Sequence, residues 1–199
     1  MSKAWLLFLF SFSVSAATAA PFNIDKLNKL GEGNMQYLFW DLYHAELFRS
    51  PQNAQGSSNQ SSNNQSSNDQ SLQSQSLKNK PSHLNSSHNT TALRLTYLKS
   101  ISKNDLLKAT QDQWQHLGLP PTQTSAWLDE LSAIWPNVKS GDQLTLFITP
   151  QRTSQFYLAN HLIGTINDPY FGDAFLDIWL SKNTSEPKLR KQLLGVDKD

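Results

Sequence analysis

Two stretches of the chain carry the hydrophobic pattern of β-strands. Residues 35–48 form a long run rich in aromatic side chains, and the first half of the run is apolar at both odd and even positions. Such a run favours a strand that is covered on both faces. Residues 92–101 alternate more cleanly: one face carries Leu93, Leu95 and Tyr97, and the other carries Arg94 and Thr96. We predict that these two strands pair as a hairpin.

Apolar residues at helical spacing predict four helices in the second half of the chain. The first runs from residue 103 or 104 to 117, where Gly118 ends it, and the second covers 124–135 after a break at Pro120-Pro121. A third begins at Asp168-Pro169, with Asp as the N-cap and Pro in the first turn. A fourth begins at Ser185-Glu186-Pro187 and ends near Leu194-Gly195.

Three further strands are predicted between the helix pairs, at 143–149, 154–159 and 162–166. A tight turn at Asn160-His161 joins the last two, because Asn tolerates the left-handed backbone of such turns. The order is then strand pair, helix pair, strand trio, helix pair. It predicts an α+β fold in which a layer of helices backs an antiparallel sheet.

The first 19 residues have the features of a secretory signal peptide. Lys3 precedes a short apolar run, and small residues follow it, with Ala17 and Ala19 spaced for cleavage after Ala19. The run is shorter than the roughly 20 residues that cross a bilayer, so an uncleaved anchor is the weaker interpretation. We expect an exported, periplasmic protein with no transmembrane span after cleavage.

A second segment, 52–91, is predicted to be a disordered insertion between the two paired strands. It consists largely of Ser, Asn and Gln and has almost no apolar surface with which to offset the entropy of ordering. The cost of closing a loop grows only with the logarithm of its length, so a hairpin tolerates such an insertion. The remainder of 20–199 is the size of one domain.

Composition excludes several classes of function. The 199 residues include no cysteine, which excludes disulfides, thiolate-bound metals and a cysteine nucleophile. The formal net charge of +1 lacks the clustered basic residues that nucleic-acid binding needs. No cofactor motif occurs, and the histidines lack metal-ligand spacing. A metal pairing of His44 with Asp41 or Glu46 is conceivable, but a surface position on a strand explains His44 better, and we predict no metal site.

The aromatic content allows two interpretations. The chain has 6 Trp, 10 Phe and 5 Tyr, and their helical and strand spacing is typical of a packed core. The alternative is an apolar cleft between sheet and helices that holds a hydrophobic ligand. The pattern alone leaves both open.

Several stretches together resemble one protein family. They include Gly31-Glu32-Gly33-x-Met35, Phe39-Trp40-Asp41-Leu42-Tyr43, Ala92-Leu93-x-Leu95-x-Tyr97, Ile134-Trp135-Pro136, Ile163-Gly164-x-Ile166-x-Asp168-Pro169 and Ile178-Trp179-Leu180. In this order and spacing they resemble the bacterial exported chalcone isomerase-like proteins. The resemblance implies that 20–199 is one such domain, an open-faced β-sandwich with an apolar cleft between its antiparallel sheet and its helices.

What the resemblance implies about activity is divided. The plant enzymes of the superfamily close a flavanone ring and use an arginine just before the first long strand and a threonine within it. This sequence has no Arg before Arg49, and Tyr43 occupies the position of the threonine. Other members bind fatty acids without catalysis.

We therefore expect a non-catalytic protein that binds a hydrophobic small molecule such as a fatty acid, with no cofactor. The residues expected to contact the ligand are Phe39, Tyr43, Arg94, Tyr97 and Trp114. The alternatives are an isomerase of the intramolecular-lyase type, whose catalytic residues the sequence does not identify, and a structural or interaction protein without a ligand. The oligomeric state, the pathway and the role of the insertion are not predicted.

Overall fold

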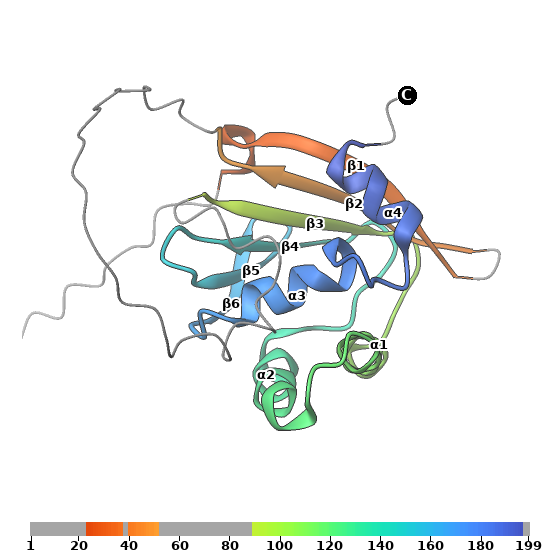
Figure 1. Cartoon of the computed structure of the whole chain (residues 1–199), viewed down its shortest axis with the longest axis vertical. Coiled ribbons are helices and arrows are strands. Elements are labelled where there is room, and N and C mark those ends of the chain that lie inside the picture. Colours follow the sequence, from red (N-terminus) through yellow and green to blue (C-terminus); the bar gives the residue numbers. More distant parts are fainter. Residues whose placement is uncertain (1–22, 38–39, 52–88, 197–199) are drawn as a thin grey trace, which may run out of the picture.

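An antiparallel sheet with its strands in sequence order forms the framework of the described residues (Figure 1). The computed structural model describes residues 23–37, 40–51 and 89–196. Its elements are, in chain order, a 3-10 turn (Ile24–Lys26), β1 (Asn28–Tyr37), β2 (Trp40–Arg49), β3 (Thr91–Tyr97), α1 (Lys103–His116), α2 (Pro121–Ile134), β4 (Gln143–Ile148), β5 (Ser154–Leu158), β6 (His161–Ile166), α3 (Phe171–Leu180) and α4 (Pro187–Leu194). The predicted α+β class is confirmed.

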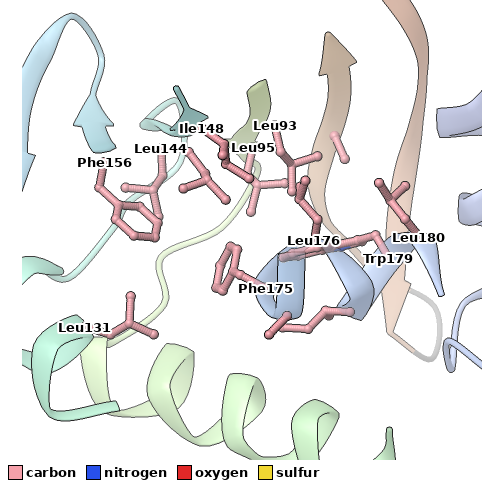
Figure 2. Packing of buried hydrophobic residues seen from close by; sticks show 14 of the residues in the cluster. Leu93, Leu95, Leu131, Leu144, Ile148, Phe156, Phe175, Leu176, Trp179 and Leu180 are labelled. Atoms are coloured by element: carbon pink, nitrogen blue, oxygen red, sulfur yellow. The ribbon is translucent and has the colours of Figure 1, made fainter. Parts of the chain in front are cut away.

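The helices cover one face of the sheet, which we call the covered face. On β2 and β3 this face carries Tyr43, Ala45 and Leu47 opposite Tyr97, Leu95 and Leu93. Helix α3 lies against these strands, and α1 and α2 lie farther from the sheet on the same side (Figure 1). Figure 2 shows Leu93, Leu95 and Leu144 of the strands and Phe175 and Trp179 of α3 within the same cluster of buried side chains. The covered face therefore supplies most of the hydrophobic core.

Helix α4 covers the part of this face that lies on β1. A Cβ atom on Gly31 would overlap the carbonyl oxygen of Gln192, and a Cβ on Gly33 would overlap the side-chain amide of the same residue. Only glycine therefore allows the backbone of β1 to approach α4 so closely. Gly195, with a φ of 67°, ends α4 in the left-handed conformation.

The opposite face, which we call the open face, has no helix among the described elements on it and carries a row of ion pairs. Glu46 is central to this row, since its carboxylate lies 2.7 Å from Arg94 Nε and 3.2 Å from Lys29 Nζ. The Arg94 guanidinium also lies 5.1 Å from the centre of the Phe48 ring, in cation–π geometry. The side chains of the open face thus stabilise one another laterally.

The predicted strand at 35–48 is wrong as a single element. Its residues belong to two strands, β1 and β2, which pair antiparallel with Met35 opposite Tyr43. The run contains no Gly, Pro or Asn, and positions 38–39 lie outside the described residues. An apolar run without these residues gives no sequence signal that one strand ends and another begins, which explains the error. The predicted pairing of this region with 92–101 is confirmed, because Leu47 lies opposite Leu93.

Several predicted boundaries also differ from the structure. Helix α2 begins at Pro121, three residues before its predicted start, because a proline fits the first helical position, where no N–H is needed. Helix α3 begins only at Phe171. Asp168 accepts hydrogen bonds from the Tyr170 backbone N–H and from Trp127 Nε1, both at 2.8 Å. The turn between β5 and β6 lies at 159–160, where Ala159 has a φ of 52°.

Both segments that the sequence predicts to lie outside the fold are largely beyond the described residues. The predicted signal peptide, 1–19, lies there entirely. Of the predicted insertion, 52–91, only the last three residues are described, and Thr91 is the first residue of β3 rather than part of the insertion. Among the helices that the structure describes, none has the length and apolar character needed to cross a membrane.

Candidate ligand cavity

A cavity of about 500 Å³ lies between the covered face of the sheet and helices α1 and α3. Its volume falls within the range of roughly 300–1,000 Å³ that small-molecule pockets occupy. The inner wall is apolar and comes from both layers: Leu93, Leu95, Leu144, Leu146 and Phe156 from the sheet, Phe175, Ile178 and Trp179 from α3, and Trp135 after α2. Such a wall can bury the apolar body of a ligand.

The cavity exists because α1 stands away from the sheet. Helix α1 packs against α2 and α3, and the side chains that join the three helices are aromatic. Trp114 of α1 is fully buried, donates a hydrogen bond from Nε1 to the Ala174 carbonyl at 2.9 Å, and contacts the rings of Trp127, Phe171 and Phe175. This aromatic junction holds α1 at a distance that leaves space over the strands.

Two tyrosines provide polar groups in the apolar wall. Tyr43 of β2 and Tyr97 of β3 are cross-strand neighbours whose rings meet edge to face with centroids 5.9 Å apart. Trp179 Nε1 donates a hydrogen bond to the Tyr43 hydroxyl at 2.9 Å. Burial raises the pKa of both phenols well above the ordinary value, so both stay protonated at neutral pH.

The mouth of the cavity is polar. Its side chains come from the exposed stripe of α1 and from the segment that precedes α4, and they are Asp105, Lys108, Asp112, Gln113, Ser185 and Glu186. Lys108 Nζ lies 2.8 Å from the carboxylate of Asp112, and both side chains are mainly exposed. Burial raises the pKa of the Glu186 carboxyl. Three carboxylates thus surround the entrance beside one ammonium group.

Two of the five residues expected to contact a ligand, Tyr43 and Tyr97, line this cavity. Trp114 lies in the aromatic junction and is not part of the lining. Arg94 lies on the open face, where it pairs with Glu46 and cannot reach the cavity through the sheet, so its expected place is corrected. Phe39 lies outside the described residues.

The expected ligand contacts include none of the mouth and only Tyr43 and Tyr97 of the inner wall. Ser185 and Glu186 are predicted only as a helix start, and Trp135 and Trp179 belong to the aromatic residues that fit either a packed core or a cleft. No sequence signal locates these four side chains at one cavity, because the distance between α1 and the sheet depends on how the helices pack on one another. The alternation of β3 did indicate that Arg94 and Tyr97 lie on opposite faces of the sheet.

A second cluster of polar side chains lies on the open face. The carboxylates of Glu32 and Glu46 and the imidazole of His44 have ligand atoms within 4.8 Å of one another. Lys29 Nζ contacts both carboxylates, at 2.6 Å and 3.2 Å, and Arg94 contacts Glu46. Two cations already occupy the positions from which a metal would bind these oxygens, and we interpret the cluster as an ion-pair network.

Comparison with known proteins identifies the fold. Residues 70–195, more than half of the chain, match the family model described as chalcone isomerase-like. An uncharacterized protein of Haemophilus influenzae is 31% identical over 106 residues, which are 53% of this chain and 52% of that protein. The chain therefore spans about half the length of this curated relative. The crystal structure of a fatty-acid binding protein of Arabidopsis thaliana aligns with a TM-score of 0.58 at 11% identity, over 94% of this chain and 95% of that one.

Proposed function

This chain belongs to the chalcone isomerase-like family, and from that premise we propose that it binds a hydrophobic small molecule and does not convert it. The observation that carries the proposal is the cavity of about 500 Å³ with its apolar inner wall. A structurally similar protein is named for fatty-acid binding, which supports a ligand with a long apolar body.

The position of the charged side chains supports a binding role over catalysis. Ring closure of the kind associated with the family places a guanidinium where it stabilises a developing enolate. Among the described residues no arginine lines the cavity, and Arg94, the one arginine on β3, pairs with Glu46 on the other face of the sheet. The lysine at the mouth, Lys108, is mainly exposed and pairs with Asp112.

We propose further that the protein is exported, to the periplasm if the cell is bacterial. The charge, the apolar run and the small residues of 1–19 support this. Mass spectrometry of the protein isolated from the periplasmic fraction should give the mass of a chain that begins at Ala20. Recovery of the full-length mass from the cytoplasm would contradict export.

Native mass spectrometry tests the binding role most directly. Protein purified gently from the exported fraction should carry an additional mass of a few hundred daltons, which extraction with organic solvent removes and identifies. Ala109→Trp narrows the mouth from the exposed side of α1 and should reduce the fraction of loaded protein. Gln115→Trp on the same helix, outside the lining, is the matched control and should load normally.

A protein of bare mass in both wild type and variants would contradict the proposal unless added ligand binds. Saturating ligand should then raise the free energy of unfolding by roughly 2.7 kcal/mol at a hundredfold excess over the dissociation constant. Turnover of a chalcone above the spontaneous rate would instead support the isomerase alternative. Absence of both binding and turnover would favour a structural or interaction role.

A further inference from the structure

We infer that the cavity selects an uncharged lipophile whose polar end is a carbonyl oxygen, and that it discriminates against the carboxylate of a free fatty acid. This inference rests on the proposed binding function and specifies the chemical class of the ligand. Three features of the cavity carry it: the apolar wall, the hydroxyl groups of Tyr43 and Tyr97, and the charges at the mouth.

The inner wall offers hydrogen-bond donors but no positive charge. Trp179 Nε1 donates to the Tyr43 oxygen, so the hydroxyl hydrogen of Tyr43 remains available. The Tyr97 hydroxyl makes no hydrogen bond to any other described residue, although this side chain is only 2% exposed. Neither phenolic hydrogen is therefore donated to a described residue, and a ligand carbonyl in the cavity would supply an acceptor.

A carboxylate would fit this wall poorly. Transfer of an ion into an apolar site costs several kcal/mol unless a counter-charge or several hydrogen bonds compensate it. No lysine, arginine or histidine of the described chain belongs to the inner wall. An uncharged carbonyl has a much lower desolvation cost, which one or two hydroxyl donors can offset.

The opposite orientation, with the polar end of the ligand at the mouth, is also unfavourable for an anion. Asp105, Asp112 and Glu186 surround the entrance, and the Lys108 ammonium is already bound to Asp112 at 2.8 Å. A fatty-acid carboxylate there would meet like charges within a Debye length. An uncharged molecule enters past these side chains without that repulsion.

The test compares decanoic acid with 2-undecanone, which have the same number of heavy atoms but differ in charge. Trp135 and Trp179 line the cavity, so intrinsic tryptophan fluorescence reports binding to the intact mature protein near neutral pH. The ketone should bind at least tenfold more tightly than the acid. Equal or tighter binding of the acid would overturn the inference and leave the proposed function standing, whereas failure of both probes would overturn both.

Variants test separately the two proposed causes of selectivity, which are the phenol hydroxyls of the inner wall and the charges at the mouth. Tyr97→Phe removes a hydroxyl that bonds to no described residue. It should reduce the affinity for the ketone about fivefold or more and leave the midpoint of urea unfolding unchanged. Tyr43→Phe should act in the same direction but also loses the bond from Trp179. If both variants bind the ketone as tightly as wild type, the assignment of the phenols is wrong.

The charges at the mouth are tested by Asp105→Asn, Asp112→Asn and Glu186→Gln in one chain. This variant should raise the affinity for decanoic acid several-fold relative to the affinity for the ketone, because only the anion responds to the removed repulsion. Addition of salt should raise the affinity of wild type for the acid for the same reason. If neither the triple substitution nor added salt raises the affinity for decanoic acid, the electrostatic part of the inference is overturned.

Discussion

On β2 and β3, side chains a few residues apart lie on opposite faces of the sheet and have different surroundings. Tyr43 and Tyr97 border a cavity, and their hydroxyl groups donate to no other described residue, whereas Glu46 and Arg94 form an ion pair at 2.7 Å on the other face. On the open face, the charged side chains of Lys29, Glu46 and Arg94 form ion pairs with one another. On the covered face, a cavity remains beside two hydroxyl groups that donate to no described residue. On the proposed function, the hydrogen-bonding capacity left in this wall serves a ligand rather than stability.

Stability should therefore depend most on the covered face, at the aromatic junction. Phe171 is fully buried and contacts Trp114, Trp127, Phe156 and Phe175. Phe171→Ala should lower the free energy of unfolding by about 3–5 kcal/mol, measured by urea denaturation. The same substitution at Phe147, a half-buried position of the open face, should cost clearly less. A larger loss at Phe147 would reverse the comparison between the faces.

The contact between β1 and α4 should give the next largest effect. Gly31→Ala introduces a Cβ against the backbone carbonyl of Gln192, which cannot move without moving the helix. We expect a loss of about 1–3 kcal/mol, as for other overpacked sites. Gly33→Ala meets the flexible Gln192 and Leu189 side chains instead and should cost less. Equal losses in the two variants would show that α4 adjusts freely.

Arg94→Ala sharpens the comparison, because it should affect stability without affecting the ligand. Glu46, only 8% exposed, would keep Lys29 but lose its nearer cation. The expected loss is about 1 kcal/mol. The affinity for the ligand should remain that of wild type, because Arg94 and the cavity lie on opposite faces of the sheet. A marked loss of affinity with normal stability would return Arg94 to the site.

The smallest expected effect is a dependence on pH that originates from the open face. Burial alone would raise the pKa of Glu46, but the hydrogen bonds and charges of Arg94 and Lys29 outweigh it and hold the pKa below the ordinary 4.5. The stability contributed by this carboxylate is therefore complete above that value and is lost as the pH falls through the lower folded-state pKa. Lys29 also lowers the pKa of Glu32, which titrates in the same direction.

Urea denaturation at pH 7 and at about pH 3.5 measures this effect. Wild type should lose more stability between the two conditions than Glu46→Gln does. The same difference in both proteins would assign the acid sensitivity to other carboxylates. Arg152→Ala is a useful control, since it breaks the Arg152–Asp173 pair, which shares no residue with the ion pairs of Glu46.

The sequence predicts the layers of this fold better than its connections. The alternation in β3 and the helical stripe of α1 were interpreted correctly because buried faces impose periodicity. The division of 35–48 into β1 and β2 was missed because the run is apolar across it, and the start of α2 was misplaced because Pro121 was interpreted only as a helix breaker. Each error lies where local chemistry is ambiguous and tertiary packing decides.

The candidate site shows the same limit. Tyr43 and Tyr97 could be inferred because one face of β2 and β3 had to meet the helices. Arg94 was expected among the ligand contacts, although the alternation of β3 places it with Thr96 on the face opposite Tyr97. Glu186 could not be inferred at all. Its place at the mouth depends on how the segment before α4 runs past α1, and no short-range pattern in the sequence describes that.

The close approach of α4 to β1 has a consequence for the order in which the molecule can be completed. β1 is the first of the described strands in chain order, and its glycines have no side chains with which to cover the inner surface there. Helix α4, which covers it, is the last of the described elements in chain order. Contacts between such distant segments are slow to form. The covered side of β1 therefore stays open until α4 docks on it, and these two elements become native together.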